Sequence, residues 1–186
     1  MIFNKHSDLV GEHAFLSPSK HSWINYDEDK VVSSYLKYLA ATKGTELHKF
    51  ACDCIRLNIK LPTNRKTLNR YVNDAIGYRM TPEQPLFYSI NAFGTADAIS
   101  FRDNVLRIHD LKTGISHVPM SQLEIYVAFF CLEYNVNPRD IEMELRLYQS
   151  DEVVVHKPEW KHIKDIMNKT ISFDRKLEIV KTEAED

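Results

Sequence analysis

The stretch that decides the fold is "GTADAISFRDNVLRIHDLKTG", which runs from Gly94 to Gly114. It contains two short runs rich in aromatic and β-branched residues, and they flank "RDN", a cluster typical of turns. This pattern predicts two adjacent antiparallel strands. Counting outward from Asn104, Asp97 lies seven residues away and Asp110 lies six away. The count sets the hairpin register to within one residue, and this register is expected to bring the two carboxylates close together.

The second of these strands ends in an alternating polar pattern. Asp110 and Lys112 are two residues apart, so their side chains are expected on one face of the strand, with His109 and Leu111 on the other. An Asp–Lys pair alone is compatible with an ordinary surface ion pair. Asp97 changes that interpretation, because two neighbouring carboxylates repel each other and raise each other's pKa unless a cation lies between them.

A hard divalent cation such as Mg²⁺ or Mn²⁺ suits a pair of carboxylates. Such a cation lowers the pKa of a water molecule that it binds. Lys112, on the same face as Asp110, is then expected to orient the attacking water and to stabilise the charge that grows on a phosphoryl group. The pattern therefore predicts hydrolysis of a phosphodiester bond.

The chain before the hairpin has the periodicity of helices. Ser17 and Pro18 form a plausible helix start, with serine as the cap and proline in the first turn. Apolar spacing predicts further helices, and Gly44 and Pro62 are expected to separate them. The predicted ranges are 28–43, 45–61 and 63–80, preceded by an irregular arm at 1–16.

From residue 85 the period changes from helical to alternating. Three consecutive strands are predicted as an antiparallel meander, followed by an apolar helix, an alternating strand, a further strand and one or two amphipathic helices. The fold class is thus α/β (α+β), with one domain over 1–186. The predicted ranges are 85–94, 95–101 and 105–111 for the meander, 121–135 for the helix, 141–149 and 151–157 for the later strands, 159–180 for the last helical segment and 181–186 for a flexible tail.

The composition is that of an ordinary globular domain, with 186 residues and a net charge of −2. The charge neither supports nor excludes a nucleic-acid partner, because carboxylates at a metal site offset a basic groove. Three cysteines without a C-x-x-C pair argue against a disulfide framework and favour free thiols in a reducing cytosol. The N-terminus has no signal-peptide pattern and no run is long and apolar enough for a membrane span, so a cytoplasmic protein is expected.

Polar side chains on two helices extend the candidate site. Gln122 and Tyr126 are four residues apart and share a face of the helix predicted at 121–135. On an otherwise apolar helix, they indicate hydrogen bonds toward something polar, although packing between helix and sheet is the alternative. His48 interrupts the apolar side of the helix predicted at 45–61, where it is either a core histidine or a metal ligand.

The segments "GTADAI", "HDLKTG" and "QLEIY" resemble successive motifs of the PD-(D/E)XK nuclease superfamily in its RecB/Cas4-like branch. That branch pairs G-x-x-D with D-x-K-T and Q-x-x-x-Y, after a histidine on an earlier helix. The resemblance covers about residues 44–149. It implies a restriction-endonuclease-like core of order α-β-β-β-α-β with extra N- and C-terminal helices.

The resemblance also implies roles for individual residues. His48, Asp97, Asp110 and the backbone carbonyl of Leu111 would bind Mg²⁺ or Mn²⁺, and Lys112 would be catalytic. Gln122 and Tyr126 would line the site and contact DNA or orient Lys112. Cas4 proteins hold an iron–sulfur cluster with four cysteines, whereas only Cys131 lies near that region here, so no such cluster is expected.

The resulting hypothesis is a free-standing, metal-dependent DNA nuclease, with an exonuclease favoured over an endonuclease. The phrase "ELRLYQSDEV" is similar to small RecB-like nucleases of tailed bacteriophages, which implies a role in phage DNA replication, recombination or end processing in the host cytoplasm. Phage replication or recombination proteins and a second copy of the chain remain open as partners. One alternative is a non-catalytic DNA-binding or scaffolding module, against which the set Asp97, Asp110 and Lys112 argues. A glycosidase is the other, and it would not need Lys112.

Overall fold

The computed structural model describes residue 7 and residues 13–114 and 119–185. Its contacts divide the chain into two compact units, Met1–Lys43 and Gly44–Asp186. The motifs of the candidate site all belong to the second unit.

The first unit is helical where it is described. A short 3-10 helix, η2 (Pro18–Asn25), begins after Ser17 with proline in its first turn, as the sequence predicts. Trp23 stabilises this turn, because its indole Nε1 donates a hydrogen bond to the Ser17 carbonyl at 3.0 Å. The unit continues into the first part of helix α1 (Glu28–Arg56). The arm expected at 1–16 lies largely outside the described residues.

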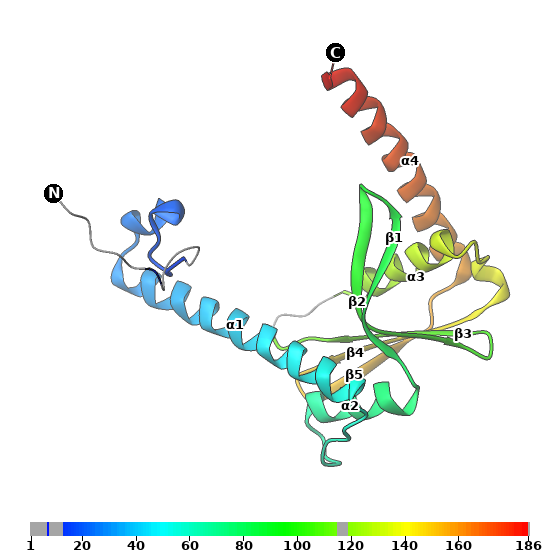
Figure 1. The fold of residues 1–186 in the computed structure, drawn as a ribbon, viewed down its shortest axis with the longest axis horizontal. Helices are drawn as coiled ribbons and strands as arrows, with labels where there is room; N and C mark the ends of the chain where they lie inside the picture. Colours follow the sequence, from blue (N-terminus) through cyan, green and yellow to red (C-terminus); the bar gives the residue numbers. More distant parts are fainter. Residues whose placement is uncertain (1–6, 8–12, 115–118, 186) are drawn as a thin grey trace. The chain divides into compact units, whose positions relative to one another are not determined.

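The second unit is built on a five-stranded mixed sheet, which confirms the α+β class (Figure 1). The first three strands form the expected antiparallel meander, and helix α3 (Ser121–Glu133) then returns the chain so that the fourth strand is parallel to the third. The fifth strand pairs with the fourth in antiparallel fashion. In spatial order the strands are β1 (Thr81–Ser89), β2 (Ala92–Arg102), β3 (Val105–Leu111), β4 (Glu142–Gln149) and β5 (Glu152–His156), and a 3-10 turn, η3 (Pro138–Asp140), precedes β4.

Two apolar clusters cover the faces of this sheet. One joins the sheet to α3 and to the first turns of α4 (Trp160–Glu185), with Leu123, Val127 and Ile163 fully buried. The other joins the sheet to α2 (Thr67–Gly77) and the end of α1, through residues such as Val72 and Leu111. The sheet therefore lies between helices on both faces, and the residues in the middle of its strands are apolar on both faces.

Gly44 does not end a helix, so the predicted division of this segment into two helices is wrong. Helix α1 runs through it without a break. A Cβ at this position would lie 2.7 Å from the Oγ1 of Thr113, the residue after Lys112. The close approach of the end of β3 thus explains why a glycine occupies position 44. A glycine within a helix costs about 1 kcal/mol relative to alanine.

The first strand was also placed wrongly from the sequence. The run predicted as one strand, 85–94, contains the turn between β1 and β2, and Gly94 lies inside β2 opposite Leu86. A Cβ on Gly94 would come within 3.1 Å of the Tyr126 ring, so this glycine also reflects close packing rather than a turn. The third helix is shorter than predicted, because α2 spans Thr67–Gly77 and the chain enters β1 at Thr81.

Helix α4 is a single helix that continues through most of the segment predicted as a tail. Within the described part of the chain, no helix combines the length and apolar character needed to cross a membrane.

Candidate metal centre

The register of the meander aligns three carboxylates from three strands. Ala98 pairs with His109, so the next residues in the ladder, Asp97 and Asp110, face each other as the sequence predicts. On the other side of β2, Pro82 pairs with Ala98 and Gln84 with Ala96, which places Glu83 opposite Asp97. Glu83, Asp97 and Asp110 therefore follow one another across β1, β2 and β3.

Lys112 connects β3 to helix α3. Its Nζ donates hydrogen bonds to Asp110 Oδ1 and to Gln122 Oε1, each at 3.0 Å, and lies 2.9 Å from Asp110 Oδ2. The Asp110 side chain is only 3% exposed, and the Lys112 ammonium is the described partner of its Oδ2. The ammonium is thus held between both oxygens of a buried carboxylate and the amide oxygen of Gln122.

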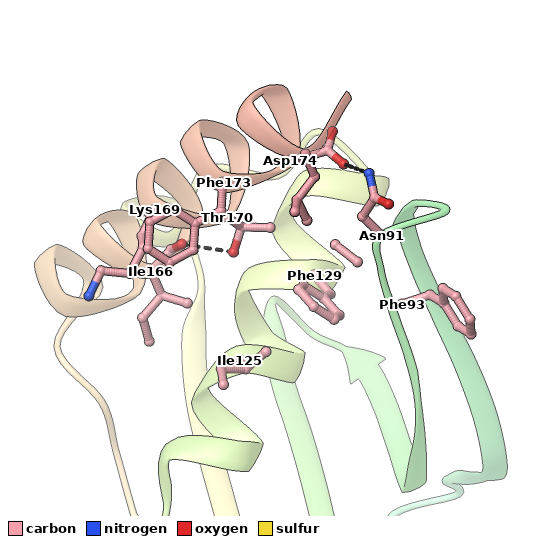
Figure 2. Close-up of a pocket in the computed structure, with 11 residues that line it drawn as sticks. Asn91, Phe93, Ile125, Phe129, Ile166, Lys169, Thr170, Phe173 and Asp174 are labelled. Carbon is pink, nitrogen blue, oxygen red and sulfur yellow. Dashed lines mark hydrogen bonds between the residues drawn. The ribbon is translucent and has the colours of Figure 1, made fainter. Parts of the chain in front are cut away.

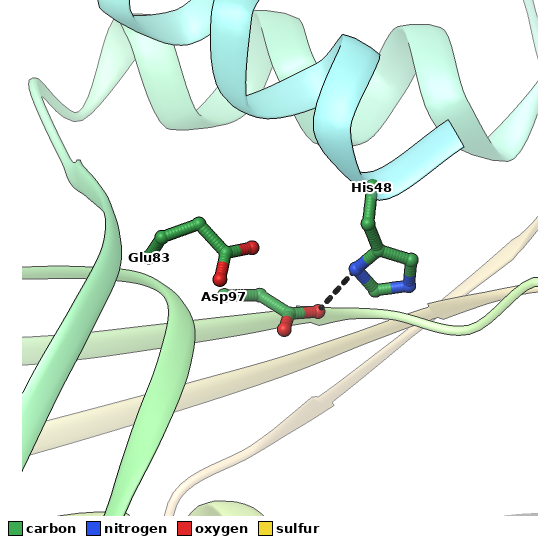
Figure 3. Close-up of side chains that lie close together, drawn as sticks. All are labelled: His48, Glu83 and Asp97. Atoms are coloured by element: carbon green, nitrogen blue, oxygen red, sulfur yellow. Dashed lines mark ion pairs between the residues drawn. The ribbon is translucent and has the colours of Figure 1, made fainter. Parts of the chain in front are cut away.

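Asp97 lies between this pair and helix α1. Its Oδ2 accepts a hydrogen bond from the Leu111 backbone N–H at 2.9 Å and lies 3.4 Å from His48 Nδ1 (Figure 3). Burial and then the neighbouring charge of Asp110 raise the pKa of Asp97 to about 6, against the opposing effects of the Leu111 N–H, His48 and Lys112. This is the behaviour of a carboxylate that lacks a full positive counter-charge.

Glu83 is a site residue that the sequence analysis missed. One ligand atom from each of His48, Glu83 and Asp97 can be chosen so that all three lie within 4.8 Å of one another. Figure 3 shows the three side chains close together. The predicted first strand started only at residue 85, so no strand register could bring Glu83 to Asp97. Its backbone has a φ of 50°, a left-handed conformation that costs a non-glycine residue about 1 kcal/mol or more. The signal available in the sequence was the Pro82 and Pro85 pair around it, which is unusual in a strand.

Tyr126 lies near the site but not on Lys112. Its hydroxyl donates a hydrogen bond to the Thr95 carbonyl at 2.7 Å, and its ring packs over Gly94. Gln122, one helical turn earlier on α3, is the residue of this pair that contacts Lys112. The structure therefore brings Gln122 to the lysine and uses Tyr126 to hold the start of β2, the strand that carries Asp97.

The residues present fit a hard divalent cation. The donors are carboxylate oxygens and one imidazole, which Mg²⁺ and Mn²⁺ accept. The Lys112 ammonium is the described partner of the nearly buried Asp110 carboxylate. Of the predicted ligands, His48 and Asp97 belong to one cluster with Glu83, and Asp110 adjoins it across β2 and β3. Leu111 contributes its N–H to Asp97, and the role of its carbonyl stays a prediction.

The opposite face of β3 holds a different polar network. His109 is fully buried, and its Nδ1 lies 3.2 Å from the Tyr148 hydroxyl, which donates a hydrogen bond to Asp74 Oδ2 at 2.7 Å. Arg146 joins the same carboxylate at 3.1 Å. Burial, with the nearby charges of Arg146 and Arg107, lowers the pKa of His109 to about 3, so the imidazole is neutral. As predicted, His109 faces away from Asp110.

Comparisons of this chain with protein-family models, with curated proteins and with solved structures find no match. The resemblance to the nuclease motifs therefore rests on the residues of this sequence and on their arrangement.

Proposed function

We propose that the chain is a metal-dependent DNA nuclease with a PD-(D/E)XK-like core. The observation that carries the proposal is the position of Lys112, whose ammonium is shared between buried Asp110 and Gln122 while Asp97 faces Asp110 across the hairpin. A structural ion pair requires neither the second carboxylate nor the amide. A phosphoryl-transfer site requires carboxylates for a cation and a separate positive group for the substrate.

The fold supports the same proposal. The order α2-β1-β2-β3-α3-β4, with β3 and β4 parallel, agrees with the α-β-β-β-α-β order expected of a restriction-endonuclease-like core. In this interpretation the site lies where β2 and β3 carry their acidic residues toward α1 and α3. The assignment to that fold family is part of the proposal.

The proposed cation ligands are His48, Asp97, Asp110 and the Leu111 carbonyl, and the geometry adds Glu83. Mg²⁺ or Mn²⁺ bound there would act as a Lewis acid on the phosphoryl group and lower the pKa of water. Lys112 would stabilise negative charge on the phosphoryl oxygens, with its ammonium oriented by Gln122. Tyr126 would keep β2, and with it Asp97, in place.

DNA as the substrate and exonuclease action follow from the sequence resemblance. The proposed role in phage DNA replication, recombination or end processing also follows from the sequence resemblance. So do the proposed location in a host cytoplasm and the other phage proteins proposed as partners. Nothing in the site's donor set requires a further cofactor.

The test is cleavage of matched linear and circular duplex DNA with Mg²⁺, Mn²⁺ or EDTA. We expect metal-dependent release of nucleotides from linear DNA only, with loss of activity in Lys112→Ala and full activity in Lys164→Ala, which removes an exposed lysine of α4. Binding of DNA without metal-dependent cleavage would contradict the proposal and favour the non-catalytic module. Cleavage of the circle would exclude a strict exonuclease, and undiminished cleavage by Lys112→Ala would remove the role given to Lys112.

A further inference from the structure

Helix α4 carries an apolar stripe that extends beyond the core of the second unit. Its members alternate at spacings of three and four residues, the pattern by which one helix packs along another. The stripe ends with an alanine four residues after its last large side chain. It consists of Ile163, Ile166, Thr170, Phe173, Leu177, Val180 and Ala184.

The two halves of the stripe differ in burial. Ile163 is 0% exposed and packs in the core with α3. Phe173, Leu177 and Val180 are 60%, 46% and 48% exposed. The second half thus presents large apolar side chains at helical spacing that no described residue covers, and a contiguous patch of this kind marks an interaction surface.

The exposed half belongs to a helix that is fixed in place. A cavity of about 380 Å³ lies between α4, α3 and the tip of the β1–β2 hairpin, lined by Phe173 and Leu177 of α4 and by Phe129 of α3 (Figure 2). At its rim, Asn91 Nδ2 in the hairpin donates a hydrogen bond to Asp174 Oδ1 at 2.9 Å. The hairpin tip therefore holds α4 at Asp174, and the stripe is preformed for a partner.

Charged residues flank the stripe in a self-complementary order. Lys176 and Glu183 lie along one side of it, and Asp174 and Lys181 lie along the other. In an antiparallel pair where Leu177 packs on Val180 of a second copy, Lys176 meets Glu183 of that copy, and by symmetry this attraction occurs twice. On the other side of the stripe, Asp174 is hydrogen-bonded to the hairpin tip and Lys181 pairs with Glu178 of its own chain at 2.8 Å.

A parallel pair would reverse part of this complementarity. The heptad spacing would then bring Lys176 beside Lys181 of the second copy, which is a repulsive contact. Lys176 and Glu183 make no ion pair with any described residue of their own chain, so both are available. Charge order therefore selects the antiparallel arrangement.

We propose that the exposed half of the α4 stripe binds the same stripe of a second copy, forming an antiparallel, two-fold symmetric homodimer. The surface lies on α4, and none of its residues belongs to the candidate metal centre. The proposal is thus independent of the proposed nuclease activity.

The first test is the mass of the full chain in solution by light scattering after size-exclusion chromatography. We expect twice the chain mass of 21.7 kDa, and the chain mass itself for Leu177→Glu. Ile179→Glu is the matched control, because Ile179 is equally exposed on the opposite side of the same helix, and it should stay dimeric. A wild-type monomer at every concentration, or a Leu177→Glu dimer, overturns the proposal.

Charge reversal provides a test that does not disturb the apolar stripe. Lys176→Glu should raise the dissociation constant at least tenfold, and adding Glu183→Lys should restore it. An unchanged dissociation constant in Lys176→Glu overturns the proposed pairing.

Cross-linking tests the direction of the helices. The three native cysteines are all buried, so oxidation reports on an introduced cysteine. A mixture of Leu177→Cys and Val180→Cys chains should form mainly mixed disulfide dimers. Predominant pairing of Leu177→Cys with itself would overturn the antiparallel arrangement.

Discussion

Two neighbouring residues of β3 are almost completely inaccessible, and their surroundings differ in kind. His109 faces α2, where the Tyr148 hydroxyl, Asp74 and Arg146 form a network on the Nδ1 side of a neutral imidazole, whose buried Nε2 has no hydrogen-bond partner among the described residues. Asp110 faces α3, where Lys112 is its described partner and a second carboxylate faces it across the hairpin. One side of the strand neutralises its buried polar groups, whereas the other concentrates like charges. The first arrangement stabilises a fold, and the second indicates a binding site.

The largest expected difference between the two sides is in cleavage. Asp110→Asn should lower the rate of metal-dependent DNA cleavage by roughly 10³-fold, because it removes a charged ligand at the proposed centre. Tyr148→Phe is the matched change on the opposite side and should leave the rate per folded molecule unchanged. Initial rates, corrected for the folded fraction by circular dichroism, make the comparison. Equal losses in both variants would mean that the two sides do not differ in function.

The second difference is in stability without a divalent cation. Lys112→Ala leaves the buried carboxylate of Asp110 without its counter-charge, so we expect the free energy of unfolding to fall by about 3 kcal/mol. Mn²⁺ should recover part of this loss, since the cation replaces the missing positive charge. Urea unfolding with and without Mn²⁺ measures both effects. A loss that Mn²⁺ does not change would indicate a purely structural ion pair.

The two sides should also respond to pH with opposite signs. The pKa of Asp97 is raised to about 6, so the folded chain binds more protons than the unfolded chain between about pH 4 and 6, and this group's contribution to stability falls as pH rises. The pKa of His109 is lowered to about 3, so its contribution is lost as pH falls from about 6.5. Across its range, the effect amounts to about 3 kcal/mol for Asp97 and about 5 kcal/mol for His109.

Unfolding of the metal-free chain between pH 4 and 7 separates these contributions. Relative to the wild type, Asp97→Asn should gain stability as pH rises, and His109→Phe should gain stability as pH falls. Parallel pH profiles for both variants and the wild type would contradict the assigned pKa directions.

The smallest expected effect concerns the contact between α1 and the end of β3. Gly44→Ala improves helix propensity by about 1 kcal/mol, but its new Cβ would lie 2.7 Å from Thr113 Oγ1. We expect the single variant to be no more stable than the wild type. In a Thr113→Ala background, the same change should stabilise the chain by about 1 kcal/mol. Additive effects in this double-mutant cycle would show that the two residues are not in contact.

The sequence was sufficient for the central hairpin. Alternation and the "RDN" turn predicted β2 and β3, and a count from Asn104 gave the register of Asp97 and Asp110. It was also sufficient for the order of strand, apolar helix and strand around α3, whereas the parallel pairing of β3 with β4 comes from the structure. These features depend on local spacing, which a single sequence contains.

The features that the sequence did not reveal depend on contacts between distant segments. Gly44 resembles a helix end until Thr113 is placed beside it, and Gly94 resembles a turn until the Tyr126 ring is placed over it. Glu83 became a site residue only when the start of β1 moved to Thr81 and the strand register set it opposite Asp97. Local propensity cannot supply these pairings, because no turn signal in the sequence sets the register or the packing that brings each pair together.

The most direct test of the candidate centre is calorimetric titration of the full chain with Mn²⁺ at pH 7.5. We predict saturable binding in the wild type, its loss in Asp97→Asn, and wild-type affinity in Asp74→Asn, which removes a carboxylate from the network behind the sheet. Absence of binding by the wild type, or equal binding by Asp97→Asn, would contradict the assignment of these carboxylates to a cation.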